Sequence, residues 1–372
     1  MTKNLIPTIN ISSILKNGFE NPKSLKTIKK IKKACVDIGF FQITGHGISQ
    51  KKIKNVCNVG NKFFNLTEKN KKKLSPKKWN IKNTNIYRGY FPSDVNGKEG
   101  LDIGDLKITK NYAKKIKNQY IEHLSLNKSI NKKSIKILSD YFDHIFNLGE
   151  SLFKSVIKLY DKDIASSKEV FKRLKTLSTL RFNYYPNQTR PVEVSKQDGV
   201  ALGCETHVDS GIFTILYQDK KGGLQVQNKK NKKWHNVPFN KKALVVNTGR
   251  ALEFLTKGKF KATNHRVLWN KADRMSIPFL IFGLLDRSFK ISAESCWTNS
   301  QLLSSIALLQ SFISIEISVA LSFPSIALRN TFVLWPRSTP SSTINGLSFN
   351  SVSLCNLRSC CATKRLSSDL DK

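Results

Sequence analysis

The sequence has few acidic residues and few arginines, and its cysteines are mostly isolated. Asp and Glu together number 26 against 63 Lys and Arg, and only 12 of the basic residues are arginine. No two of the seven cysteines form a Cys-x-x-Cys pair. This pattern argues against a zinc ribbon or a disulfide scaffold and favours a reducing compartment. The N-terminal residues contain no apolar stretch of signal-peptide length, so we expect a cytoplasmic location.

The formal net charge of +37 would allow binding to nucleic acid or to an anionic membrane. The excess, however, is lysine in dispersed runs, such as residues 71–73 and 229–233. A nucleic-acid groove usually interleaves arginine with aromatic residues, and that interleaving is missing here. Lysine and asparagine rise together when a gene is rich in A and T. We therefore expect no specific nucleic-acid partner, and a basic nucleic-acid-binding protein stays an alternative.

The chain divides into three parts by its residue patterns. Residues 1–175 are mainly helical in pattern: Asn21-Pro22 begins one helix, Gly39 ends it, and apolar residues recur at helical spacing from 135 to 159. Residues 176–288 contain short β-like runs between Gly, Asn, Asp and Lys turns, which is typical of a sandwich or barrel. These runs are residues 180–185, 212–217, 224–226, 243–247, 265–268 and 276–282.

Residues 289–372 form an atypical tail that is rich in serine and leucine. The last 83 residues hold seven of the 63 basic residues but 19 serines. This break is typical of another reading frame or of the opposite strand of an AT-rich gene, and the tail would then be disordered or of anomalous origin. A membrane segment over residues 301–328 is the other interpretation, but Glu316 and Pro324 interrupt it. We expect no membrane association.

His207-Val208-Asp209 and the distant His265 form a pattern that suits a metal ion. Two imidazoles and one carboxylate make up the facial triad that binds non-haem Fe(II) and leaves one side of the metal open. Alternate side chains of a strand share a face, so a His-x-Asp pair can direct both donors to one point while His265 arrives from a neighbouring strand. The pair alone does not distinguish this site from a histidine that packs in a sheet or lies on its surface.

Arg274-Met275-Ser276 shows the same alternate spacing nine residues after His265. Guanidinium groups bind carboxylates through a planar fork of two donors, and a neighbouring hydroxyl adds a third hydrogen bond. The far end of a dicarboxylate such as 2-oxoglutarate requires such a clamp, although a surface arginine beside an unrelated serine has the same spacing. The apolar run 277–282 indicates a strand that enters a core, with Arg274 at its mouth.

A third run, residues 181–186, places Arg181, Asn183 and Tyr185 on one face of a strand. Aromatic residues that simply pack a sheet would explain this run equally well.

The order of the motifs in the chain is nevertheless informative. The ordered set Asn-Tyr-Tyr-Pro, His-Val-Asp, Gly-Gly-Leu-Gln-Val, Asn-His-Arg and Arg-Met-Ser resembles the isopenicillin N synthase-like family of Fe(II)/2-oxoglutarate oxidoreductases. Residues 6–10, 39–48, 88–90 and 100–104 also resemble that family, and the similarity covers about residues 5–287.

The resemblance implies an α+β protein with a mainly β core. This core is a double-stranded β-helix, or jelly roll, at residues 176–288, and the N-terminal helical region at residues 1–175 packs on it. The resemblance also implies the roles of the site residues. The iron ligands are His207, Asp209 and His265, the clamp on the distal carboxylate of 2-oxoglutarate is Arg274 and Ser276, and further co-substrate contacts are Asn183 and Tyr185. We expect Trp234 in the core and His123, His144 and His235 facing solvent.

The implied activity is that of an Fe(II)- and 2-oxoglutarate-dependent dioxygenase. Such an enzyme hydroxylates or otherwise oxidises a small-molecule C–H bond with O2 and releases succinate and CO2. We expect a monomer with no catalytic residue beyond the metal centre. One alternative is an oxidase of the same fold whose Arg-x-Ser pair holds a substrate carboxylate. Another is an inactive product, because the Pro-containing segment and C-terminal helix of the family have no match after Arg287.

Overall fold

A computed structural model describes residues 5–93, 97–116, 121–160, 177–187, 191–269 and 272–283. The chain divides into two compact units, residues 1–309 and 310–372, and all described residues belong to the first. Our expectations for the tail at 289–372, including the apolar segment at 301–328, lie outside the described residues. No helix in the described part of the chain is long and apolar enough to cross a membrane.

The first long helix forms as its sequence predicts. α2 (Pro22–Asp37) begins at Asn21, whose side chain accepts a hydrogen bond from the Lys23 amide, and a proline occupies the first turn. Gly39 follows the helix with a φ of +72°, and a Cβ at this position would lie 1.9 Å from the Lys261 carbonyl oxygen. Glycine is therefore required here, both for the left-handed backbone and for the close approach of the segment that leads to His265.

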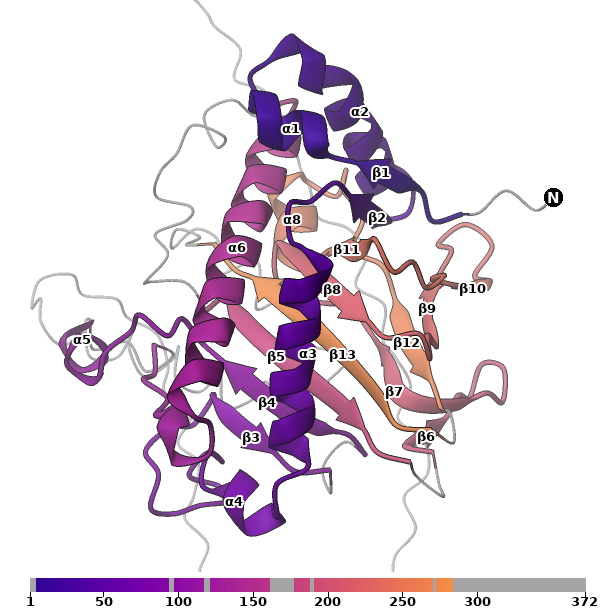
Figure 1. Ribbon diagram of the computed structural model, residues 1–372. Helices are drawn as coiled ribbons and strands as arrows, with labels where there is room; N and C mark the ends of the chain where they lie inside the picture. The colour runs from indigo at the N-terminus through magenta and orange to yellow at the C-terminus, as the bar shows by residue number, and fades with distance from the viewer. Residues whose placement is uncertain are drawn as a thin grey trace, which may run out of the picture. The chain divides into compact units, whose positions relative to one another are not determined.

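Two helices cover the outer face of the larger sheet. α3 (Gln50–Phe64) and α6 (Lys132–Ile157) run side by side across this face (Figure 1). α6 confirms the predicted apolar periodicity at 135–159, because its buried positions recur at helical spacing. The shorter helices are α1 (Ser12–Asn17), α4 (Glu68–Lys72), α5 (Lys110–Ile116), the 3-10 helix η1 (Leu126–Lys128) and α8 (Arg250–Leu255).

The strands form a large sheet and a small sheet. The large sheet has the order β1 (Thr8–Asn10), β2 (Phe40–Thr44), β11 (Leu244–Thr248), β8 (Phe213–Gln218), β13 (Arg274–Ile281), β5 (Thr179–Tyr185), β4 (Glu99–Ile103) and β3 (Gly89–Phe91). The small sheet has the order β10 (Trp234–Asn236), β9 (Leu224–Gln227), β12 (His265–Leu268), β7 (Ala201–His207) and β6 (Glu193–Val194). Neighbouring strands are antiparallel except for the parallel pair β1 and β2.

Strand alternation divides the apolar side chains of the large sheet between two cores. On the outer face, Phe279 meets Phe142 of α6 edge to face, with ring centroids 4.9 Å apart. On the inner face, side chains of the large sheet pack against the small sheet, and this inner core contains Phe40, Leu216, Val226, Val245 and Val267. The two facing sheets with an N-terminal helical cover confirm the predicted jelly roll. The described strands do not close into a barrel.

The sequence predicted six of these strands, but some local expectations were wrong. Each of the six β-like runs coincides with a strand. His123 and His144 are exposed as expected, whereas His235 is half-buried. Trp234 is also only half-buried, because its strand lies at the edge of the small sheet and its ring stacks on the guanidinium of Arg266, 4.0 Å from the ring centroid.

Candidate metal centre

The two histidines of the predicted triad lie directly across the small sheet from each other. His207 is the last residue of β7 and His265 the first residue of β12, and the two are paired in register. Their ring centroids are 4.2 Å apart. Strand pairing thus brings together two imidazoles that are far apart in the sequence.

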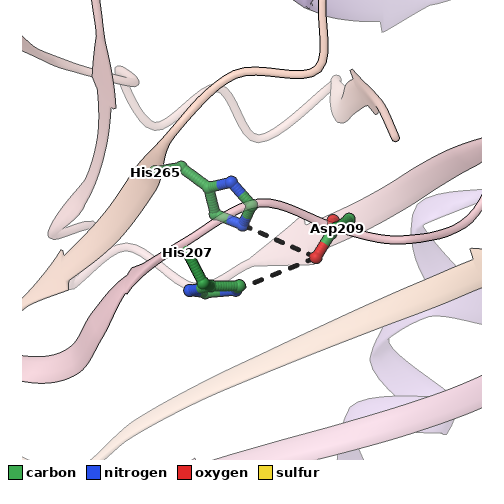
Figure 2. Close-up of side chains that lie close together, drawn as sticks. All are labelled: His207, Asp209 and His265. Carbon is green, nitrogen blue, oxygen red and sulfur yellow. Dashed lines mark ion pairs between the residues drawn. The ribbon is translucent and has the colours of Figure 1, made fainter. Parts of the chain in front are cut away.

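Asp209 completes the cluster from the loop that follows β7 (Figure 2). Its Oδ1 atom lies 3.8 Å from Nε2 of His207 and 3.7 Å from Nε2 of His265. One ligand atom from each residue lies within 4.8 Å of the other two. The strand ends at His207, so the loop conformation, rather than simple strand alternation, directs Asp209 toward the histidines.

Hydrogen bonds to the far side of each ligand orient its free donor atom. Nδ1 of His207 lies 2.9 Å from the Glu205 carbonyl oxygen, and Nδ1 of His265 lies 3.2 Å from the Thr263 carbonyl oxygen. An imidazole that donates from Nδ1 to a carbonyl keeps the lone pair of Nε2 available for a metal. Both Nε2 atoms face the carboxylate of Asp209 (Figure 2).

The carboxylate of Asp209 is held from the large sheet. Its Oδ2 atom accepts hydrogen bonds from Oγ1 of Thr214 at 2.5 Å and from Nδ2 of Asn247 at 2.8 Å. Thr214 on β8 and Asn247 on β11 are themselves paired across the sheet. Because both donors bind Oδ2, Oδ1 remains free on the side of the histidines.

The loop that carries Asp209 packs closely against the start of α8. The amide of Arg250 donates to the Asp209 carbonyl oxygen at 2.8 Å. A Cβ on Gly249 would lie 2.1 Å from the Gly211 carbonyl oxygen and 3.0 Å from that of Asp209. The absence of a side chain at Gly249 therefore permits the backbone conformation that places the carboxylate.

The pKa values of the three groups follow from burial and from their mutual charges. Burial alone would raise the pKa of Asp209, but the two histidines and the two hydrogen bonds to Oδ2 lower it to about 2. Burial and the charge of His207 lower the pKa of His265 to about 4. Burial would also lower the pKa of His207, but the neighbouring Cys204 and Asp209 raise it to about 9. In the metal-free protein, a cation must therefore displace a proton from His207.

This donor set fits Fe(II). Two imidazole nitrogens and one ionised carboxylate oxygen are the ligands of a facial triad, which leaves positions for a co-substrate and oxygen. Each ligand also has the outer hydrogen bond that is typical of metal-binding side chains.

The four predicted co-substrate residues meet on the inner face of the large sheet. Arg274 pairs with Tyr185 and Ser276 with Asn183 across β13 and β5. Nη1 of Arg274 lies 3.3 Å from Oγ of Ser276, its Nε donates to the Gly222 carbonyl oxygen at 2.7 Å, and its guanidinium lies 4.7 Å from the Tyr185 ring centroid.

Arg274 is buried rather than at the mouth of the core, with only 1% of its surface exposed. The reason is that the turn at Gly222 covers its guanidinium. Among the described residues, no carboxylate forms a salt bridge with Arg274. A buried cation without an anionic partner is costly, so this position favours a bound carboxylate from a ligand.

Sequence reasoning missed the residues that support the metal ligands. Thr214 and Asn247 are polar residues in otherwise apolar strands, and such an interruption is the signal that would have indicated them. Cys204 was also missed. Its Sγ atom accepts a hydrogen bond from Nζ of Lys98 at 3.1 Å and lies 4.0 Å from Nδ1 of His207.

Comparison with known proteins identifies the family. The model of the 2OG-Fe(II) oxygenase superfamily matches residues 176–283, and the model described as non-haem dioxygenase in morphine synthesis N-terminal matches residues 6–132. A probable iron/ascorbate oxidoreductase of Dictyostelium discoideum is 32% identical over 308 residues, which covers 74% of this chain and 80% of that protein. Isopenicillin N synthase of Streptomyces griseus is 25% identical over 283 residues, which covers 74% of this chain and 84% of that protein.

Solved structures show the same fold. The dioxygenase for auxin oxidation 1 from Arabidopsis thaliana, in its complex with 2-oxoglutarate, superposes with a TM-score of 0.57 at 21% identity, which covers 76% of this chain and 94% of that chain. A 2OG-Fe(II) oxygenase family protein from Caulobacter crescentus gives a TM-score of 0.62 at 19% identity, which covers 76% of this chain and 88% of that chain.

The chain belongs to the 2OG-Fe(II) oxygenase superfamily. It is an oxidoreductase of the dioxygenase class that uses Fe(II) as cofactor and 2-oxoglutarate as co-substrate, and it acts on a small molecule together with O2. The predictions of family, fold, enzyme class and cofactors are confirmed.

Proposed function

We propose that His207, Asp209 and His265 hold the iron and that Arg274 and Ser276 bind the distal carboxylate of 2-oxoglutarate. One observation carries this proposal: three donor atoms of the facial-triad type converge within 4.8 Å of one another. The buried guanidinium of Arg274 supports it, because no described carboxylate forms a salt bridge with it and a carboxylate of the ligand would balance its charge.

The neighbouring side chains complete the proposed co-substrate site. Asn183 and Tyr185 face Ser276 and Arg274 from the adjacent strand, so they restrict where 2-oxoglutarate can lie. Tyr185 stacks on the guanidinium and fixes its plane, which favours the two-point binding of a carboxylate.

Each protein group has a limited task in the reaction. When bound, the iron supplies the activation of O2 that couples the decarboxylation of 2-oxoglutarate to the oxidation of a substrate C–H bond. His207 and His265 present neutral nitrogen donors, and the carbonyl groups of Glu205 and Thr263 keep these rings in position. Thr214 and Asn247 fix the carboxylate of Asp209, so the ligand geometry exists before the metal arrives. Pre-organisation of this kind reduces the reorganisation that catalysis requires.

The proposal extends to organisation and location. Residues 1–175 form an N-terminal region, residues 176–288 the oxygenase core and residues 289–372 a separate atypical segment. We further propose a cytoplasmic monomer without a specific nucleic-acid partner, because the basic excess is dispersed lysine.

Succinate release tests the proposal. Wild-type protein with Fe(II), 2-oxoglutarate and O2 should form succinate, whereas His207→Ala should form none above background. His144→Ala is the matched control, because this histidine is exposed on α6, and it should retain the wild-type rate. Equal succinate from wild type and His207→Ala would contradict the assignment. Consumption of O2 without succinate would instead indicate an oxidase that does not use 2-oxoglutarate.

A further inference from the structure

Arg181 has an unusual position for an arginine in the middle of a sheet. It belongs to β5, between the fully buried residues Leu180 and Phe182, but 41% of its side-chain surface is exposed. Its partner Asp102 on β4 is paired with it in register and is only 4% exposed. The side chain of Arg181 is therefore accessible to solvent although its neighbours in the strand are buried.

Strand register places Arg181 between the metal centre and the co-substrate clamp. Alternation puts it on the same face of β5 as Asn183 and Tyr185, which meet Ser276 and Arg274. The register of β5 with β13 sets Arg181 opposite Pro278, and Pro278 is opposite Leu216 on β8. Thr214, which holds Asp209, is the next residue of β8 on the same face. The Arg181 side chain therefore belongs to the inner-face residues that lie, along the strand direction, between Ser276 of the clamp and Thr214 beside Asp209.

Electrostatics agree with this position. The charge of Asp102 is the largest cause that raises the pKa of Arg181, and the charge of Asp209 contributes as well. The field of a metal ligand thus reaches the Arg181 side chain.

Asp102 fixes the guanidinium and leaves part of it free. Nε of Arg181 donates to Oδ1 of Asp102 at 2.7 Å, and Nη2 donates to Oδ2 at 2.6 Å. A guanidinium has five N–H donors, and this pair uses two of them. Within the described part of the chain, Nη1 makes no hydrogen bond. The remaining donors of Nη1 and Nη2 form a second fork, whose shape matches a carboxylate.

Two other arginines show what a purely structural guanidinium looks like in this fold. Arg266 is 2% exposed in its side chain, and its three nitrogens bond to Gln225, Ser195 and Asp198. Arg88 is buried, and its two terminal nitrogens donate to Thr179 and to the Leu177 carbonyl oxygen. Both groups use their terminal nitrogens within the protein. Arg181 differs, because Nη1 has no hydrogen-bond partner among the described residues and the side chain is 41% exposed.

We propose that Arg181, positioned by Asp102, binds the carboxylate of a carboxylic-acid substrate beside the metal centre. The inference rests on the proposed function, because it supplies the substrate class for that site. The bidentate pair restricts the guanidinium before the substrate arrives, and its free fork then sets the orientation of the acid. The substrate carboxylate is thereby distinguished from the distal carboxylate of 2-oxoglutarate, which Arg274 takes.

Binding to the loaded protein tests the inference without a need for turnover. The probes are a series of aliphatic and aromatic monocarboxylic acids and their matching primary amides, measured by ligand-observed NMR. The protein is held without oxygen and saturated with Fe(II) and 2-oxoglutarate. We expect wild type to bind members of the acid series at least tenfold more tightly than their amides. Arg181→Gln should lose this preference by roughly 10–100-fold in affinity, the range for one charged hydrogen-bonding group.

Three further variants separate binding from folding. Arg181→Lys keeps the charge but not the fork, so it should restore only part of the preference. Arg181→Gln alone leaves Asp102 buried without its ion-pair partner, and the double variant Arg181→Gln/Asp102→Asn removes that charge and should fold while it still lacks the preference. Lys82→Gln, an exposed cation elsewhere, should bind acids as wild type does.

The outcomes of the inference and of the proposed function are distinguishable. Failure of wild type to take up Fe(II) and 2-oxoglutarate would refute the proposed function. Three results would overturn the role of Arg181 if Fe(II) and 2-oxoglutarate load normally. These are equal affinity for acids and amides, no acid binding at all, or unchanged acid binding in Arg181→Gln. Retained loading of Arg181→Gln, with selective loss of acid binding, is the expected result.

Discussion

The support of Asp209 by Asn247 gives a quantitative prediction about metal affinity. Nδ2 of Asn247 donates to Oδ2 of Asp209 at 2.8 Å, and Asn247 is only 3% exposed, so water does not readily replace this donor. A hydrogen bond to a charged group contributes about 1.5–3 kcal/mol, which corresponds to roughly 10–150-fold in an equilibrium constant. Removal of residues that support metal ligands typically costs about 10–100-fold in metal affinity. We therefore expect Asn247→Leu to bind Fe(II) roughly 10–100-fold more weakly than wild type.

The measurement is an anaerobic competition titration of Fe(II) against a chelator, with thermal unfolding of the metal-free protein in parallel. Thr214→Val removes the other donor to Oδ2 and should weaken Fe(II) binding by a similar factor. Thr256→Val is the control, because its buried hydroxyl donates to the Leu252 carbonyl oxygen in α8 and does not contact Asp209. This control should lower the melting temperature without weakening Fe(II) binding. A folded Asn247→Leu protein with wild-type affinity would refute the reasoning.

Five other predictions concern the metal centre, the co-substrate site and the packing of α6. Because the pKa of His207 is raised to about 9, Fe(II) must displace its proton, and the apparent affinity should rise with pH and level off near pH 9 in a potentiometric titration series. Cys204→Ser removes the side chain that contributes most to raising this pKa, so the curve should shift to lower pH, and an unchanged curve would exclude that cause. Gly249→Ala forces a Cβ against the Gly211 carbonyl oxygen and should reduce the iron content of the purified protein. An iron content equal to that of wild type would contradict the close packing of Gly249 against Gly211. Arg274→Lys keeps the charge but loses the two-donor fork, so calorimetry should show that 2-oxoglutarate binds at least roughly 10-fold more weakly than to wild type, with intact Fe(II) binding. Equal affinity of the two proteins for 2-oxoglutarate would exclude the clamp. Phe142→Ala removes the ring that packs on Phe279 and should lower the free energy of unfolding by about 3–5 kcal/mol in urea, and a loss below about 1 kcal/mol would show that α6 does not pack as described.

The repeating parts of the fold were predictable from the sequence because they depend on local patterns. The cap at Asn21 and the apolar spacing of α6 each specify a helix within a few turns. Short β-branched runs bounded by turn residues specified six strands. The paired positions of Arg274 and Tyr185 also agree with the alternation seen in the sequence.

The long-range features of the site could not be predicted in this way. His207 was expected on a strand, but the extent of β7 was missed because its sequence, Ala-Leu-Gly-Cys-Glu-Thr-His, lacks regular alternation of apolar and polar residues. The ion pair between Arg181 and Asp102 joins positions 79 residues apart, and only strand order brings them together. The support of Asp209 by Asn247 depends on a loop that crosses from the small sheet to the large one. Tertiary pairing decides these contacts, and a single sequence does not display it.

The most direct measurement is a crystal structure grown without oxygen in Fe(II) and 2-oxoglutarate, with anomalous diffraction recorded at the iron absorption edge. The proposed site predicts one strong anomalous peak within bonding distance of Nε2 of His207, Nε2 of His265 and Oδ1 of Asp209. It also predicts that the distal carboxylate of 2-oxoglutarate contacts Arg274 and Ser276. An iron peak elsewhere, or a peak that lacks any one of these three ligands, would contradict the proposed metal centre.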